Sequence, residues 1–115
     1  MRRLSDDEVR VLVESDAVKS STDNIGRVYE ILRVYEFKGH EKMYVVVAVK
    51  AGRVYYSVQE QGILTNQVRY MEAPLDFGGV FRNHPFFPAA ERKNIPGKTL
   101  LEGLEQVRQL ELGAS

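Results

Sequence analysis

Residues 43 to 60, MYVVVAVKAGRVYYSVQE, constrain the fold more than any other stretch of this chain. Two runs rich in valine and tyrosine flank the dipeptide Ala51-Gly52, where glycine supplies the positive φ that a tight hairpin connection demands. The pattern therefore predicts a β-hairpin. Because residues 43 to 49 are an unbroken apolar run, we expect this strand to be covered on both faces or to lie at a contact between two copies of the chain.

The stretch before this hairpin, RVYEILRVYE at 27 to 36, contains the tetrapeptide Arg-Val-Tyr-Glu twice. Its apolar spacing fits a helix, but its valine and tyrosine content and the short loop that follows favour a strand over 26–38, which we adopt with the helix as the alternative. The two copies begin six residues apart, at Arg27 and Arg33. Because side chains alternate between the two faces of a strand, an even spacing places each repeated side chain on the same face. The solvent face would carry Arg27, Tyr29, Ile31, Arg33 and Tyr35, and the buried face Val28, Leu32 and Val34. A further strand is expected at 67 to 72.

The N-terminal segment has the signals of a helix start. Ser5 stands three residues before Glu8, which is the spacing of a capping box. The residues that follow form an apolar stripe at helical spacing, which must pack against another element. The stripe consists of Val9, Leu12, Val13 and Ala17.

A second helix is expected near the C-terminus. Thr99 and Glu102 repeat the capping-box spacing, and Gly113 is a natural stop. Its buried stripe would consist of Leu100, Leu101, Leu104, Val107 and Leu110. Gly103 lies beside that stripe, so the backbone can approach its neighbour closely.

Residues 73 to 97 differ in composition from the rest of the chain, because all four prolines and four of the five phenylalanines lie there. The prolines interrupt regular structure, yet the phenylalanines are too apolar to be left in water. Two interpretations follow: the rings close one end of the core, or they form an apolar contact for a partner.

Length, charge and cysteine content exclude several classes of protein. At 115 residues the chain fits one domain, 1–115, and its apolar fraction of 43% is typical of globular proteins. The 16 lysines and arginines balance the 16 aspartates and glutamates, so no net charge draws the chain to nucleic acid or an anionic membrane. With no cysteine, it has no disulfides, zinc–thiolate sites or thiol nucleophiles. No apolar run is long enough to cross a bilayer and the start lacks a signal-peptide core, so we expect no membrane association and a cytoplasmic location.

Two apparent nucleotide-related motifs fail on their context. Gly97-Lys98-Thr99 resembles the end of a phosphate-binding loop, but the motif needs a glycine where the chain has Arg92. Asp76-Phe77-Gly78 imitates the metal-holding triplet of protein kinases in a chain too short for the rest of that machinery. We therefore expect neither a cofactor nor a bound metal.

The two histidines, His40 and His84, do not lie in an HExxH motif. His84 lies in the proline- and phenylalanine-rich stretch, where burial would perturb its pKa. His84 and Asp76 are therefore kept as a candidate ligand site, and as the candidate site of a small enzyme. The absence of other catalytic patterns favours a protein without enzymatic activity.

Together these features predict an α+β fold: an N-terminal helix, a mainly antiparallel sheet of three to five strands, the long loop at 73–97, and a C-terminal helix packed on the sheet. The function that we predict is that of a small binding protein, of the inhibitor, adaptor or immunity type, which recognises a protein partner. The predicted contact residues are Arg33, Tyr35, Tyr55, Phe77, Phe81, Phe86 and Phe87. Single-stranded nucleic acid on the same arginine and tyrosine face is the alternative, and a homodimer is equally compatible.

Overall fold

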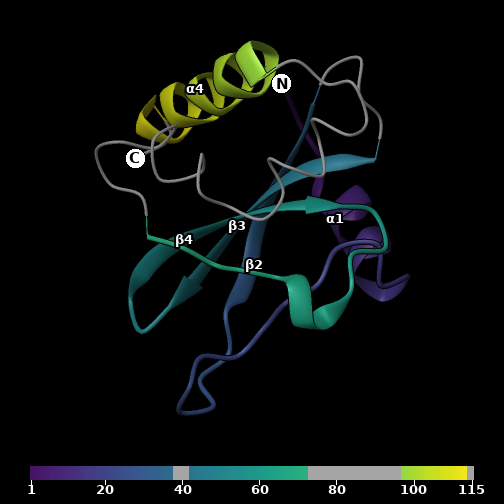
Figure 1. Ribbon diagram of the computed structural model, residues 1–115, viewed down its shortest axis with the longest axis vertical. Helices are drawn as coiled ribbons and strands as arrows, with labels where there is room; N and C mark the ends of the chain where they lie inside the picture. Colours follow the sequence, from purple (N-terminus) through teal and green to yellow (C-terminus); the bar gives the residue numbers. More distant parts are fainter. Residues whose placement is uncertain (38–41, 73–96, 114–115) are drawn as a thin grey trace.

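The computed structural model describes residues 1–37, 42–72 and 97–113, with the backbone alone for 97–101. Within these ranges the elements are β1 (Arg2–Arg3), α1 (Asp6–Glu14), β2 (Glu30–Glu36), β3 (Met43–Lys50), β4 (Arg53–Glu60), the 3-10 turn η1 (Thr65–Gln67) and α4 (Gly97–Gly113). The strands form an antiparallel sheet in the order β1-β2-β3-β4 (Figure 1). The predicted α+β fold, with helices toward both ends of the chain, is confirmed.

The hairpin of β3 and β4 has the predicted form. Lys50 pairs with Arg53, and the two residues between them have positive φ, 51° at Ala51 and 76° at Gly52. Positive φ at both central residues is the pattern of a type I′ turn, whose twist matches that of the flanking strands. Residues 43 to 48 are all buried, so β3 is covered on both faces as expected.

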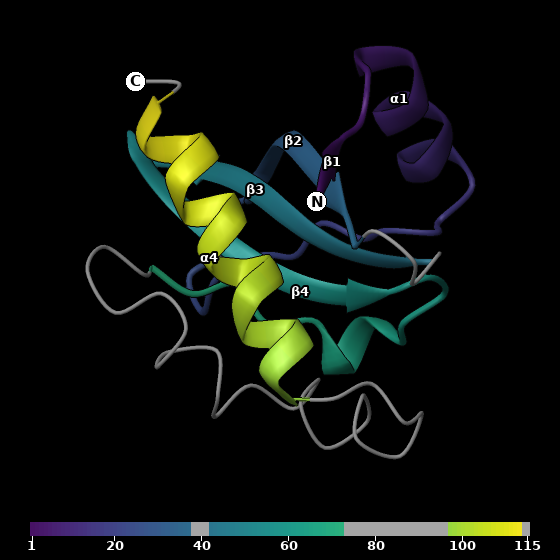
Figure 2. The same cartoon turned by 90° about the horizontal axis from the view of Figure 1, so that it is seen from above.

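The two helices cover opposite faces of this sheet (Figure 2). Side chains alternate along β3, so its odd-numbered and even-numbered residues enter two separate cores. On one face, Leu104 and Val107 of α4 pack in a cluster with Tyr35, Phe37, Met43, Val45, Val47 and Val58. On the other, Val9 and Leu12 of α1 pack against Leu4, Val18, Val34, Tyr44 and Val46.

The assignment of side chains to the two faces of β2 was wrong in part. The pairing of β2 with β3 shifts between Ile31 and Arg33, so Leu32 is an extra residue that the strict alternation did not include. Ile31 consequently packs on the α1 side, whereas Tyr35 packs under α4 and is only 1% exposed. Val34 is buried as predicted, but Val28 and Leu32 are exposed.

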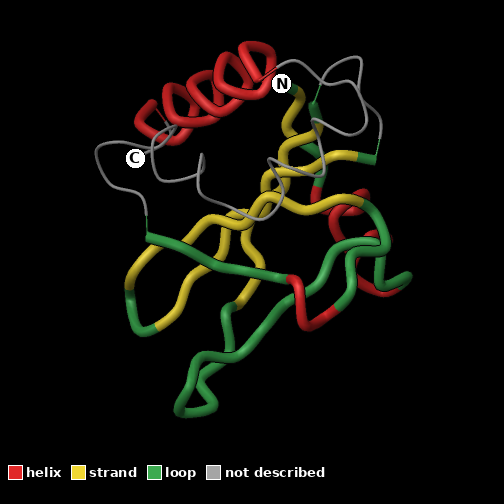
Figure 3. Tube along the Cα trace, viewed as in Figure 1, coloured by secondary structure: helices red, strands yellow, loops and turns green. Residues whose placement is uncertain are grey.

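The strand expected at 67 to 72 is reduced to one bridge. Tyr56 and Met71 exchange two backbone hydrogen bonds of 2.8 Å, whereas residues 65 to 67 form the turn η1 (Figure 3). In its place the sheet gains β1, where Arg2 pairs with Glu36 and Arg3 with Tyr35.

Capping and close packing position the helices. The predicted capping box is present at α1, with Ser5 and Glu8 each accepting a backbone hydrogen bond from the other. In α4, a Cβ at Gly103 would lie 2.7 Å from the Phe37 ring, which confirms the close approach. Leu104 and Val107 are buried as expected, whereas Leu110 is exposed. The side chains of Thr99, Leu100 and Leu101 lie outside the described residues.

No helix in the described part of the chain is long and apolar enough to cross a membrane.

Candidate functional site

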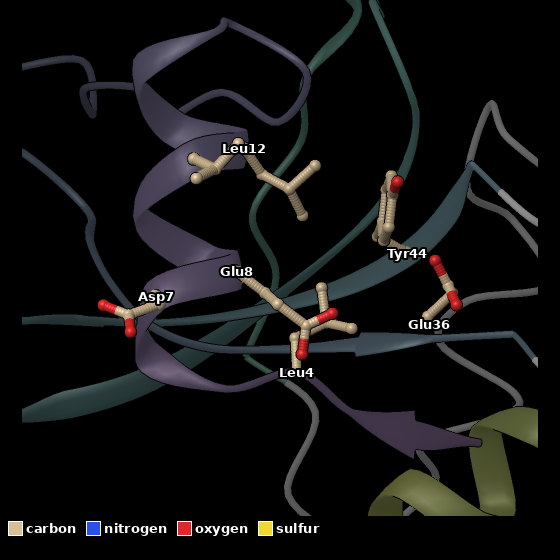
Figure 4. Close-up of a pocket in the computed structure, with 7 residues that line it drawn as sticks. Leu4, Asp7, Glu8, Leu12, Glu36 and Tyr44 are labelled. Atoms are coloured by element: carbon tan, nitrogen blue, oxygen red, sulfur yellow. The ribbon is translucent and has the colours of Figure 1, made fainter.

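A groove of about 340 Å³ lies between α1 and the sheet (Figure 4). One wall is the helix, and the other is formed by β2, β3 and the residue that leads from β1 into α1. The groove is lined by Leu4, Asp7, Glu8, Val11, Leu12, Glu36 and Tyr44. It is a concave surface in which apolar side chains meet carboxylates from two separate elements.

Local structure places the helical residues of this lining. Glu8 and Leu12 are four positions apart, as are Asp7 and Val11, so the two pairs occupy neighbouring turns on adjacent strips of α1. Leu4 is held at the base of the groove because its backbone N–H donates a 2.9 Å hydrogen bond to the Val34 carbonyl and its side chain is buried.

Arg2 connects the two walls by ion pairs. Its Nη1 and Nη2 atoms lie 3.2 Å and 3.0 Å from the Glu8 carboxylate, and Nη2 also lies 3.3 Å from Glu36 Oε1. The Arg2 hydrogen bond and the backbone N–H of Ser5 lower the pKa of Glu8 below its ordinary value. Glu8 is therefore ionised at neutral pH, and it caps the helix and binds a cation at the same time.

The apolar part of the groove is partly open to solvent. Tyr44 is buried, and its hydroxyl lies 3.3 Å from Gln61 Oε1. Val11 is 57% exposed, which is high for a large apolar side chain in a concave site. Figure 4 shows Glu8 pointing from α1 toward Glu36 and Tyr44 on the strands. A ligand that enters would therefore contact apolar surface and carboxylate oxygens together.

The sheet residues predicted to bind a partner do not share one exposed surface. Tyr35 was expected to face solvent but lies in the core beneath α4, because both faces of the sheet are covered. Arg33 lies on the same face, where its guanidinium binds the Glu111 carboxylate at 2.6 Å and 2.9 Å. Tyr55 is partly buried on the opposite face, with its ring centroid 5.1 Å from that of Tyr29. The other predicted site residues, Phe77, Phe81, Phe86, Phe87, His84 and Asp76, lie outside the described residues.

A second polar cluster surrounds Lys50, on the same sheet face as α1. Lys50 Nζ lies 3.2 Å from Asp23 Oδ2, 4.4 Å from the centre of the Tyr29 ring and 4.7 Å from that of Tyr55. The Tyr29 ring in turn stacks on Tyr70, with centroids 4.8 Å apart. Cation–π contacts and the ion pair hold the segment before β2 against the sheet.

The charges in this cluster neutralise each other. Burial alone would lower the pKa of Lys50, but hydrogen bonds to Tyr29 and Asp23 outweigh burial and raise it. A lysine that remains protonated is a poor nucleophile, so these contacts indicate a structural role for Lys50. In the described ranges, no group of three or more histidine, aspartate or glutamate side chains is arranged to hold a metal ion.

Comparison with known proteins adds no further constraint. No family model, no curated protein and no solved structure matches this chain.

Sequence reasoning missed most residues of the groove. Leu12 was assigned to the buried stripe of the first helix and Glu8 to its cap, but neither was assigned to a site. Glu36 and Tyr44 reach the groove only through the pairing of β2 with β3, in which they are partners. The one local signal was Val11, an apolar residue outside the predicted stripe of its helix.

Proposed function

We propose that this chain is a small non-enzymatic binding protein whose protein partner inserts a side chain into the groove between α1 and the sheet. The single observation that carries the proposal is the groove itself, where the exposed Val11 and the buried Leu4 and Tyr44 form an apolar hollow beside three carboxylates. Pockets that hold one anchoring side chain of a partner are typical of the centres of protein interfaces.

The size of the groove supports a side chain as its occupant. Sites for small molecules and cofactors have volumes of about 300 to 1,000 Å³, and this groove is at the lower end of that range. A groove of about 340 Å³ is a small pocket of the kind that holds an anchoring side chain at the centre of a protein interface. The partner is therefore proposed to present a short segment with an apolar anchor.

Charge favours a protein over nucleic acid. The carboxylates of Asp7, Glu8 and Glu36 line the groove and repel phosphates. Two of the arginines expected to neutralise a phosphate backbone already bind carboxylates of this chain, Arg27 to Asp23 at 2.9 Å and Arg33 to Glu111 at 2.6 Å. The phenylalanines of 73–97 remain predicted to form a second contact with the protein partner.

The test is affinity capture from native cell extract with three purified baits: the unaltered chain, Val11→Asp and Val13→Asp. Both substitutions add a carboxylate to α1 at an exposed valine, 57% and 40% exposed, but only Val11 lines the groove. A protein retained at low and high salt by the unaltered chain and by Val13→Asp, and lost by Val11→Asp, supports the proposal. Equal capture by all three baits would contradict it, as would recovery of nucleic acid that high salt removes.

Self-association is examined with the same variants. If the purified chain sediments as a dimer and Val11→Asp alone sediments as a monomer, the occupant of the groove is a second copy of the chain. Circular dichroism and thermal unfolding of each bait check that the added carboxylate leaves the fold intact.

A further inference from the structure

We infer that the groove selects a segment in which an arginine or lysine side chain lies beside the apolar anchor, and that Arg2 occupies the position of this cation in the free protein. This inference rests on the proposed function. Its basis is the position of Arg2, whose guanidinium binds Glu8 of α1 and Glu36 of β2, two carboxylates that also line the groove.

Among the described residues, the carboxylates at this site outnumber the cations that bind them. Glu8 and Glu36 share the guanidinium of Arg2, and the third lining carboxylate, Asp7, pairs with the exposed Arg10 at 3.3 Å. The hydrogen bond from Arg2 holds the pKa of Glu8 below its ordinary value, so Glu8 carries its charge at neutral pH. The site therefore keeps an excess of negative charge while Arg2 is bound, which attracts a cationic group from a partner.

Arg2 can be displaced without disturbing the core. Its side chain is 55% exposed, and ion pairs between exposed side chains contribute little to stability because water solvates both partners well. β1 is also anchored independently of Arg2, since the Leu4 N–H binds the Val34 carbonyl and the Met1 amino group binds Gln106 Oε1 at 2.7 Å. A partner guanidinium can therefore replace Arg2 while β1 stays paired with β2.

The geometry favours an amphipathic ligand over a simple cation. The Glu8 carboxylate binds Arg2 through both oxygens, an arrangement that matches the planar fork of a guanidinium. The apolar surface of Leu4, Leu12 and Tyr44 lies in the same groove. A ligand with a guanidinium at one end and an alkyl chain at the other would contact both parts.

Hexylguanidinium is the probe that represents this chemistry, and hexan-1-ol is its uncharged control. Each is titrated into the full chain while the backbone amide resonances of α1, β2 and β3 are followed by NMR. We expect hexylguanidinium to shift the resonances of Leu12, Glu36 and Tyr44 and to bind more tightly than hexan-1-ol. Equal affinities would overturn the cation requirement, and no binding of hexylguanidinium would overturn the inference as a whole.

Two variants test the place of Arg2. Arg2→Ala removes the internal competitor, so the Kd of hexylguanidinium is expected to fall about two- to five-fold, the range that an exposed ion pair allows. Glu36→Gln removes one carboxylate and leaves the helix cap intact, so that Kd should rise while the Kd of hexan-1-ol stays unchanged. An unchanged or weaker affinity of Arg2→Ala for hexylguanidinium would contradict the competition between Arg2 and the ligand. If Arg2→Ala is poorly folded, Glu36→Gln still tests the cation site.

The two proposals fail in different ways. If partner capture requires Val11 but hexylguanidinium has no advantage over hexan-1-ol, the groove is a protein-binding site without a cation requirement. If hexylguanidinium binds as expected but capture does not depend on Val11, the cation site is real and the protein partner binds elsewhere.

Discussion

Arg33 on β2 and Glu111 in the last turn of α4 form a bidentate ion pair, with Nε 2.9 Å and Nη2 2.6 Å from the two carboxylate oxygens. The pair is largely shielded from solvent, because the side chains of Arg33 and Glu111 are 24% and 9% exposed. Burial and a hydrogen bond to Glu111 raise the pKa of the neighbouring Tyr35 to about 12. The pair therefore joins the C-terminal end of α4 to the sheet above the core residue Tyr35.

We expect Arg33→Met to destabilise the protein by about 3 kcal/mol, the low end of the cost of removing one partner from a buried ion pair. The reason is that the Glu111 carboxylate would remain in a site with little solvent and no cation. Chemical denaturation in urea measures the change in the free energy of unfolding.

The matched controls are Arg10→Met and the double variant Arg33→Met with Glu111→Leu. Arg10 pairs with Asp7 at the surface, so its replacement is expected to change stability little. The double variant should recover most of the loss, because it removes both charges and leaves apolar side chains. A similar loss in Arg33→Met and Arg10→Met would show that burial does not strengthen the Arg33 pair.

The features that were predicted from the sequence depend on residues close together in the chain. The hairpin follows from the Ala51-Gly52 turn between two β-rich runs, and the first helix follows from the capping box of Ser5 and Glu8. Both signals act over a few residues, so the hairpin and the helix can be predicted without knowledge of tertiary contacts.

The features that were missed depend on distant contacts. β1 has only two residues, both arginine, and it is held by backbone pairing with Glu36 and Tyr35. Tyr35 was placed in solvent because strict alternation does not reveal that α4 covers the second face of the sheet, and Ile31 was misplaced because alternation does not reveal the bulge at Leu32. The groove likewise exists only after α1 has packed beside Glu36 and Tyr44, so Val11, an apolar residue outside the predicted stripe, was its one local signal.

The close approach of α4 to the sheet predicts that Gly103→Ala is destabilising. An added Cβ would lie 2.7 Å from Phe37 Cε1 and 3.0 Å from Cδ1, so the buried ring or the helix must move. Alanine is the better helix former by about 1 kcal/mol, but overpacking typically costs about 1 to 3 kcal/mol, so we expect a net loss of about 1 kcal/mol.

The control for this substitution is Gly113→Ala, since nothing lies within 4 Å of a Cβ built at Gly113. Thermal unfolding of both variants measures the difference. Combining Gly103→Ala with Phe37→Leu should recover part of the loss, because the smaller side chain makes room for the methyl group. A Gly103→Ala variant as stable as the unaltered chain would rule out the close contact with Phe37.

The hairpin turn predicts a stabilising substitution at Ala51. Its φ of 51° lies in the left-handed region, which costs a residue with a Cβ about 1 kcal/mol or more. Asparagine tolerates this region well, and Asn-Gly is the preferred sequence of a type I′ turn. Ala51→Asn is therefore expected to raise the free energy of unfolding by about 0.5 to 1 kcal/mol, as measured in urea. Gly52→Ala, at a φ of 76°, should lower it; if both changes are neutral, the turn has another conformation.

The contacts of Asp23 predict a loss of stability in acid. Its side chain is only 7% exposed, and it accepts hydrogen bonds from the backbone N–H groups of Ile25 and Arg27 and from Arg27 Nε, with Lys50 Nζ at 3.2 Å. Burial alone would raise the pKa of Asp23, but the hydrogen bonds from Arg27, Lys50 and Ile25 outweigh burial and lower it.

Because the folded-state pKa lies below the unfolded value of about 3.9, the Asp23 carboxylate stabilises the fold at pH values above about 4. This contribution is lost as the pH falls from about 4 toward the folded-state pKa, because protons then bind the unfolded chain more readily. Asp23→Asn should therefore be less stable than the unaltered chain at neutral pH, with a difference that shrinks as the solution becomes acidic. Urea denaturation at a series of pH values measures this difference. A constant difference at all pH values would mean that the Asp23 contacts act through shape and hydrogen bonding alone, without a contribution from the charge.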